Sequence, residues 1–190
     1  MNLGLENKVV IITGGSKGIG LACARVFLAE GGRVAIVSRS PENLDAALRD
    51  LSAQADELIA VSCDLTGRFA ANAMMAEVER RLGPVEILVN SAGAARRYLP
   101  EELSAEAWHA AMDAKYFTYI HAMDTVLPGM AKRGKGAVVN IIGMGGKVAT
   151  PFHLPGGAAN SALMLATVGL ANVSSNRWLC KPLASTTVPR

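Results

Sequence analysis

A glycine-rich segment, TGGSKGIG at residues 13–20, follows the apolar run Val9–Ile12 and opens a helical pattern. Its glycines allow a tight turn, let the backbone approach an anion and permit close packing of a helix on a strand. The N-terminus of that helix offers unpaired N–H groups and a partial positive charge to a phosphate. The segment therefore predicts a nucleotide pyrophosphate site. The expected contacts here are Thr13, Gly14, Ser16, Lys17, Gly18, Ile19 and Gly20.

The end of the second apolar run bears on which dinucleotide binds. An acidic side chain at this point would bond a ribose 2′-hydroxyl, but the chain has Ser38 followed by Arg39. Arginine suits a 2′-phosphate, because its guanidinium makes paired, charge-assisted hydrogen bonds. Lys17 adds a second positive charge within the glycine-rich segment. Either base alone is typical of a solvated surface residue, whereas together they favour NADP(H) over NAD(H).

A second stretch, NIIGMGGKVATPFHLPGGAANSALML at 140–165, has the same strand–loop–helix form. Its only titratable side chains are Lys147 and His153. Either side chain has the reach to meet a substrate as an acid, and histidine changes charge near neutral pH. A lone loop histidine is more often a solvated bystander, so both interpretations stay open.

Five short apolar runs indicate the strands that must position these residues. They are continuous rather than alternating and rich in Val and Ile, as expected of parallel strands covered on both faces. The runs are Val9–Ile12, Val34–Val37, Leu58–Val61, Ile87–Val89 and Ala137–Ile142.

Helical patterns alternate with these runs. They begin at Ile19, at Pro41 behind a Ser40 cap, at Phe69 (to Leu82), at Ser104 (to Met130) and at 156 (to 172). This alternation predicts an α/β fold, a Rossmann-like doubly wound parallel sheet of about five strands. We expect one NAD(P)-binding domain over 1–172 and an irregular tail over 173–190.

Composition narrows the classes of function. The chain has 190 residues and a net charge of +3 without a basic run, which argues against nucleic acid as a partner. The longest apolar segment, 156–171, contains Asn160 and Ser161, so no membrane span is expected. Three cysteines without metal or disulfide spacing predict a cytoplasmic protein with no metal site.

Three motifs in order, TGGSKGIG, CDL at 63–65 and NSAG at 90–93, resemble the short-chain dehydrogenase/reductase family over about residues 5–172. The resemblance implies that Asp64, with Leu65, contacts the adenine. It also implies that Asn90, Ala92 and Gly93 support the central sheet and line the cofactor. The simpler alternatives are that Asp64 caps the following helix or stabilises a turn, and that Asn90 satisfies a backbone group at the strand end.

The same resemblance implies hydride transfer to a carbonyl or from an alcohol, assisted by an Asn–Ser–Tyr–Lys set. This chain departs from that set at every position. Gly143 stands at the Ser position, Gly156 at the Tyr position, Asn160 at the Lys position and Lys115 at the Asn position. Three readings follow: an active oxidoreductase, an NADP-binding protein without dehydrogenase activity, or a non-functional fragment.

Lys115 falls on the expected inward stripe of its helix, with Trp108, Ala111, Met112 and Tyr119. A lysine on an apolar face is costly unless it is paired or faces a pocket. One hypothesis is that Lys115, beside Asn160, restores a positive charge near the nicotinamide ribose. The alternative is that its stem extends along the face and its amine bonds a backbone carbonyl.

The family pattern is not followed beyond residue 172, which suggests a truncated or frame-shifted chain that lacks the family's last strands. Ala137–Ile142 would then lie at the edge of the sheet. The resemblance also implies a homo-oligomer formed through the helices at 104–130 and 156–172. Arg96, Arg97 and Tyr98 follow the NSAG motif, where they could meet an anionic substrate.

Overall fold

The computed structural model describes residues 3–53, 56–93 and 96–175, and its core is a parallel five-stranded sheet of order β3-β2-β1-β4-β5. This order confirms the predicted doubly wound, Rossmann-like fold. Every residue of β1 is buried, because helices cover both faces of the sheet. The strands are β1 (Val9–Thr13), β2 (Arg33–Ser38), β3 (Leu58–Ser62), β4 (Ile87–Asn90) and β5 (Ala137–Asn140).

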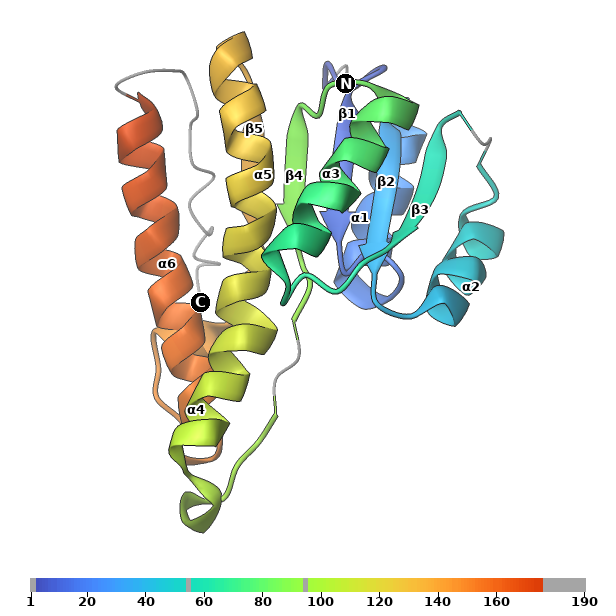
Figure 1. Ribbon diagram of the computed structural model, residues 1–190. Helices are drawn as coiled ribbons and strands as arrows, with labels where there is room; N and C mark the ends of the chain where they lie inside the picture. Colours follow the sequence, from blue (N-terminus) through green and yellow to red (C-terminus); the bar gives the residue numbers. More distant parts are fainter. Residues whose placement is uncertain (1–2, 54–55, 94–95, 176–190) are drawn as a thin grey trace.

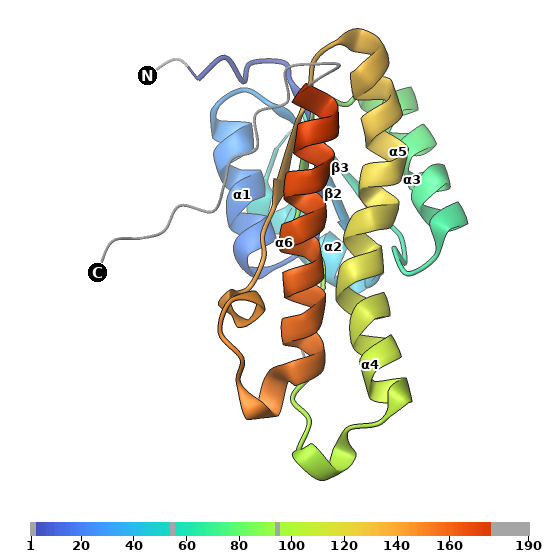
Figure 2. The same ribbon diagram turned by 90° about the vertical axis from the view of Figure 1, so that its left-hand side faces the viewer.

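Helices pack on both faces of the sheet (Figure 1). The first two helices bury Ala24, Leu44 and Ala47 against one face, and the third and fifth form the larger core on the other. The last helix lies beside the fourth and fifth at the β5 end (Figures 1 and 2). The α-helices are α1 (Gly18–Ala29), α2 (Pro41–Leu51), α3 (Arg68–Leu82), α4 (Ala105–Ala111), α5 (Thr118–Arg133) and α6 (Leu154–Ser175). The 3₁₀ turns are Pro100–Glu102, Met144–Gly146 and Pro151–His153.

The helix predicted over 104–130 is divided into three parts. The π-helix Met112–Phe117 joins α4 to α5, and α5 continues to Arg133. A π-helical turn winds more widely than 3.6 residues, so one stripe cannot be extended across it. The predicted inward position of Trp108 is therefore wrong. Its side chain is 37% exposed, and the neighbouring Ala107 is buried instead.

Other boundaries differ by a few residues. The fifth strand ends at Asn140 rather than at 142 and lies at the edge of the described sheet, as expected. The helix predicted over 156–172 runs from Leu154 to Ser175, so residues 173–175 are helical rather than part of an irregular tail. The rest of the predicted tail, 176–190, lies outside the described residues. The cap at Ser40 is confirmed, because its hydroxyl accepts a hydrogen bond from the Asn43 amide at 3.2 Å.

By length and composition, one segment of the described chain, Pro151–Asn172, is apolar enough to cross a membrane, with a mean hydropathy of 1.2. Core helices of globular proteins pass the same test. This segment fully buries Ala159 and Leu163 inside the fold, so it is weak evidence for a membrane span.

Candidate functional site

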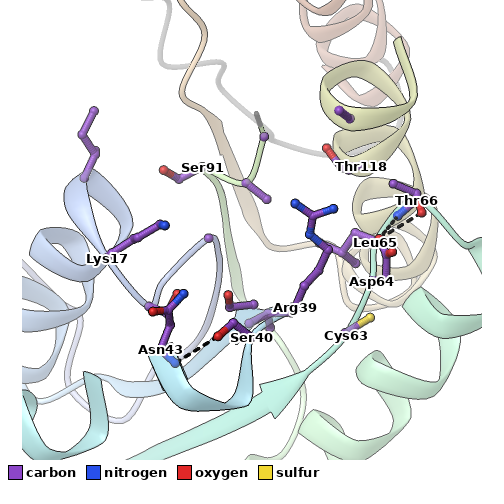
Figure 3. A pocket seen from close by; sticks show the side chains of 18 residues that line it. Lys17, Arg39, Ser40, Asn43, Cys63, Asp64, Leu65, Thr66, Ser91 and Thr118 are labelled. Carbon is purple, nitrogen blue, oxygen red and sulfur yellow. Dashed lines mark hydrogen bonds between the residues drawn. The ribbon is translucent and has the colours of Figure 1, made fainter. Parts of the chain in front are cut away.

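A cavity of about 510 Å³ opens at the carboxyl ends of β1 to β4, where the strand order reverses (Figure 3). Crevices at this position are the ligand sites of open α/β sheets. Ten of the residues predicted to bind a cofactor line it: Gly14, Ser16, Lys17, Ile19, Ser38, Arg39, Asp64, Leu65, Ala92 and Gly93. Other residues that line it were not predicted from the sequence, among them Ser40, Asn43, Cys63, Thr66, Ala114 and Thr118.

The glycine-rich turn brings two backbone segments together at the mouth of this cavity. Gly14 has φ +68°, and a Cβ there would lie 2.9 Å from the backbone of Ala92. A Cβ on Gly20 would collide with the carbonyl oxygen of Gly14. Lys17 is the N-cap of α1, so the positive end of that helix opens towards the cavity. These features fit a pyrophosphate held by backbone N–H groups.

Thr13 and Asn90 do not line the cavity, but their hydrogen bonds hold the backbone of Ser91 and Ala92, which do. The Thr13 hydroxyl donates to Asn90 Oδ1 at 3.2 Å and accepts from the amides of Ser91 and Ala92 at 3.2 Å each. Asn90 is completely buried and donates to Asn140 Oδ1 at 2.9 Å. Both of these bonds join the Asn90 side chain to other side chains and not to the backbone group that the simpler expectation named, although the role they give Asn90 is structural.

Asn140, which was not predicted from the sequence, extends these hydrogen bonds across the sheet. It lies opposite Asn90 in the register of β4 and β5, and its Nδ2 donates to Thr167 Oγ1 of α6 at 2.9 Å. One chain of side chains thus joins β1, β4, β5 and α6 behind the cavity. The sequence signal was a second asparagine at a strand end, at the same level as Asn90.

Arg39 extends from the end of β2 into the cavity, towards the segment that holds Asp64 (Figure 3). Asp64 Oδ1 accepts from the amide of Thr66 at 3.0 Å and from its hydroxyl at 2.9 Å. These bonds, with the nearby guanidinium of Arg39, lower the pKa of Asp64. Asp64 therefore stabilises the turn before α3, as the simpler alternative predicted, and also forms part of the cavity wall.

Lys115 is half-buried next to the inner end of the cavity. Its Nζ donates to Tyr119 Oη at 2.8 Å and to the carbonyl oxygen of Ile141 at 3.3 Å. Burial lowers the pKa of Lys115 to about 8. Its stem packs under Gly93, where a Cβ would lie 2.6 Å from Lys115 Cδ. The expected hydrogen bond to a backbone carbonyl is therefore present. Lys115 itself does not line the cavity, but its neighbours Gly93 and Ala114 do.

Asn160 is buried to 5% exposure, but its Oδ1 has no hydrogen-bond partner, so Lys115 does not donate to it. Its Nδ2 would lie 3.0 Å from a Cβ at Gly143. A Cβ on Gly157 would lie 2.7 Å from the carbonyl oxygen of Gly145. The turn at 143–146 and the start of α6 thus meet backbone to backbone, and this close approach depends on glycine.

His153 occupies the space beside Gly156. A Cβ at 156 would lie 2.6 Å from His153 Nε2 and still nearer to Cε1. The same histidine lines a second cavity of about 690 Å³, together with Arg97, Met144, Gly145, Val148, Thr150 and Phe152. Lys147 is exposed and lines neither of these two cavities. Arg96 stacks on the ring of Tyr98, with its Cζ 5.0 Å from the ring centroid.

A family model described as short chain dehydrogenase matches residues 8–177. The chain belongs to the short-chain dehydrogenase family. The match includes every strand of the sheet and every residue of the first cavity. Members of this family use a nicotinamide cofactor, which is consistent with a dinucleotide in that cavity.

Curated short-chain dehydrogenases resemble the chain over most of its length. It is 34% identical to 2,3-dihydro-2,3-dihydroxybenzoate dehydrogenase of Bacillus subtilis, covering 73% of this chain and 53% of that protein. It is 32% identical to gluconate 5-dehydrogenase of Gluconobacter oxydans, covering 88% of this chain and 65% of that protein. The chain therefore spans between half and two thirds of the length of these relatives.

Solved structures share the fold. An NADPH-bound short-chain oxidoreductase of Pseudomonas aeruginosa PAO1, described as containing an atypical catalytic center, superposes with a TM-score of 0.83. That structure is 31% identical, and the match covers 90% of this chain and 67% of that one. A short chain dehydrogenase from Bacillus anthracis superposes with a TM-score of 0.88 at 25% identity, covering 93% and 74%.

Proposed function

We propose that this short-chain dehydrogenase binds NADP(H) and reduces a carbonyl compound or oxidises the corresponding alcohol. The observation that carries the cofactor preference is Arg39, which enters the first cavity where an acidic residue would select NAD(H). Lys17 lines the same cavity and adds a second cation. Both side chains suit a 2′-phosphate, and the activities named for the two curated relatives support alcohol–carbonyl chemistry.

The lining residues fit the parts of the dinucleotide. The turn that contains Gly14 and the N-terminus of α1 would hold the pyrophosphate, and Asp64 and Leu65 would flank the adenine. Gly93, with Lys115 behind it, would face the nicotinamide ribose. Bound there, the cofactor supplies or accepts the hydride.

The free thiols of Cys23 and Cys63 support a cytoplasmic location.

The test of the cofactor preference is the variant Arg39→Gln, with Arg49→Gln as its matched control. Arg49 is exposed on α2 and does not line the cavity. Loss of a charged hydrogen bond of about 1.5–3 kcal/mol should weaken NADPH binding roughly 10- to 100-fold, measured by calorimetry. NADH affinity should change little, and Arg49→Gln should match the unmodified protein. Equal losses of affinity for NADPH and NADH in Arg39→Gln would contradict a role of Arg39 in binding the 2′-phosphate.

A second candidate is an NADP-binding protein without turnover. The observation that favours it is glycine at the two positions, Gly143 and Gly156, where the family resemblance implies Ser and Tyr. Consumption of NADPH with a panel of ketones and aldehydes separates the two functions. Binding with turnover supports the oxidoreductase, whereas tight binding without turnover of any panel member supports the second candidate.

A further inference from the structure

The contact between His153 and Gly156 links two departures from the family pattern. A Cβ on Gly156 would lie 2.6 Å from Nε2 of the imidazole, a distance that real Cβ atoms do not adopt. The ring therefore fills the space in which any side chain at 156 would begin. The glycine at 156 and the histidine three residues earlier are sterically coupled, so the missing side chain at 156 does not leave an empty position.

The cavity beside this contact suits an apolar molecule. Met144, Val148 and Phe152 line it and expose 67%, 60% and 53% of their surface. Of the seven residues that line it, only His153 and Arg97 are titratable, and neither carries negative charge. Its volume of about 690 Å³ lies within the usual range of small-molecule pockets.

Resting on the function proposed above, we propose that this cavity takes an apolar carbonyl substrate and that His153 is the catalytic acid at the carbonyl oxygen. In the reduction, the hydride and its electron pair pass from the dihydronicotinamide to the carbonyl carbon. The C=O π pair moves to oxygen, which takes the proton of the imidazolium. Water then returns a proton to the ring. In the reverse reaction, the neutral imidazole accepts the proton of the alcohol.

The other nearby acid–base groups are less well placed for this step. Lys147 is exposed and does not line the cavity. Lys115 is held by Tyr119 Oη and by the carbonyl oxygen of Ile141. Tyr119 is completely buried and donates to that same carbonyl at 2.7 Å. Of the two titratable side chains that line this cavity, His153 is the one whose ring lies against Gly156.

The geometric part of the proposal is tested with Gly156→Ala and the matched control Gly169→Ala. Both glycines lie in α6, but a Cβ on Gly169 meets nothing within 4 Å. A methyl at 156 should displace the imidazole, because the obstructing atoms are the end of a side chain rather than backbone. We expect the His153 ring resonances in NMR spectra to shift in Gly156→Ala and to remain in place in Gly169→Ala. Unchanged His153 resonances in Gly156→Ala would overturn the coupling.

The chemical part is tested on the NADPH-loaded protein with two probes, butyrophenone and its carboxylate analogue 3-benzoylpropionate. His153→Ala and His153→Asn should each lower kcat by at least about 100-fold, as loss of a general acid does. NADPH affinity should stay within about twofold, because His153 does not line the first cavity. Gly156→Ala should lose turnover in the same way, and Gly169→Ala should keep it.

The pH profile gives a second readout that a purely structural role would not move. Because the protonated ring is the acid in reduction and the neutral ring is the base in oxidation, reduction should slow and alcohol oxidation should accelerate as the pH rises. Both trends should vanish in the residual activity of His153→Asn. Wild-type turnover in His153→Ala would overturn this proposal and leave the proposed function intact. If the unmodified protein binds NADPH and reduces members of the ketone and aldehyde panel but neither probe, the apolar carbonyl site proposed here is overturned and the proposed function stands.

Discussion

At the scale of single residues, Lys115 is the side chain whose burial needs a reason. It packs beneath Gly93, and its Nζ bonds Tyr119 Oη and the Ile141 carbonyl oxygen. No carboxylate of the described residues forms an ion pair with it. Burial without a counter-charge lowers the pKa of Lys115 to about 8. The charged amine therefore costs stability at neutral pH. Such a cost is typical of functional positions, and Lys115 lies beneath Gly93, where we propose that the nicotinamide ribose binds.

We expect Lys115→Met to raise the free energy of unfolding at pH 7 by about 1–3 kcal/mol, because the buried charge is removed. Tyr119 keeps its bond to the Ile141 carbonyl oxygen in this variant. Between pH 8 and 10.5, the unfolded protein binds more protons at Lys115 than the folded one. The advantage of the variant should therefore shrink as pH rises. Urea denaturation at several pH values measures this, with the exposed Lys132→Met as control.

The same variant tests the hypothesis that Lys115 supplies positive charge to the cofactor. Lys115→Met should weaken NADPH binding several-fold even though it stabilises the free protein. Unchanged NADPH affinity would leave Lys115 with only its bonds to Tyr119 and the Ile141 carbonyl oxygen, and the hypothesis would fail.

Part of the site follows from local sequence. The glycine-rich turn, Arg39 and Asp64 each lie within two residues of the end of a strand, and parallel strands bring those ends to one edge. The contact of His153 with Gly156 could not be predicted, because it depends on where α6 begins and how the Pro151–His153 turn enters it. The Asn140–Thr167 bond likewise needs the packing of α6 on β5, which no local pattern specifies.

At the scale of elements, strands were predictable and the long helical region was not. Burial on both faces selects continuous Val and Ile runs, which the sequence displays directly. The π-helix Met112–Phe117 has no comparable signal, since its wider winding is set by packing between neighbouring elements. The error in the position of Trp108 follows from that one turn.

Thr167→Val should lower the free energy of unfolding by about 1 kcal/mol. The hydroxyl of Thr167 accepts from Asn140 Nδ2, and without this hydroxyl Nδ2 keeps only a 3.5 Å contact to Met123 Sδ. Thr125→Val is the matched control, because the Thr125 hydroxyl also donates to a carbonyl of its own helix. Chemical denaturation should show a clearly smaller loss for Thr125→Val. Equal losses would mean that the bond between α6 and β5 contributes nothing.

At the scale of the whole molecule, α6 forms an outer surface beside α5 (Figure 2). Its Leu165 and Val168 are 77% and 55% exposed, and their spacing of three residues places them on one face of the helix. We propose that this surface is part of a homo-oligomer interface. Light scattering should show an oligomer for the unmodified chain and a smaller species for Leu165→Glu, with the exposed Leu3→Glu as control. An unchanged mass for Leu165→Glu would contradict this interface.

The most direct test of the central claim is the thermal unfolding of the protein alone, with NADPH and with NADH at equal concentration. The cavity that contains Arg39 and Lys17 predicts a cooperative transition that NADPH raises more than NADH. At a hundredfold excess over Kd, the expected stabilisation by NADPH is about 2.7 kcal/mol. An equal shift with both cofactors, or none with NADPH, would contradict an NADP(H) site at this edge of the sheet.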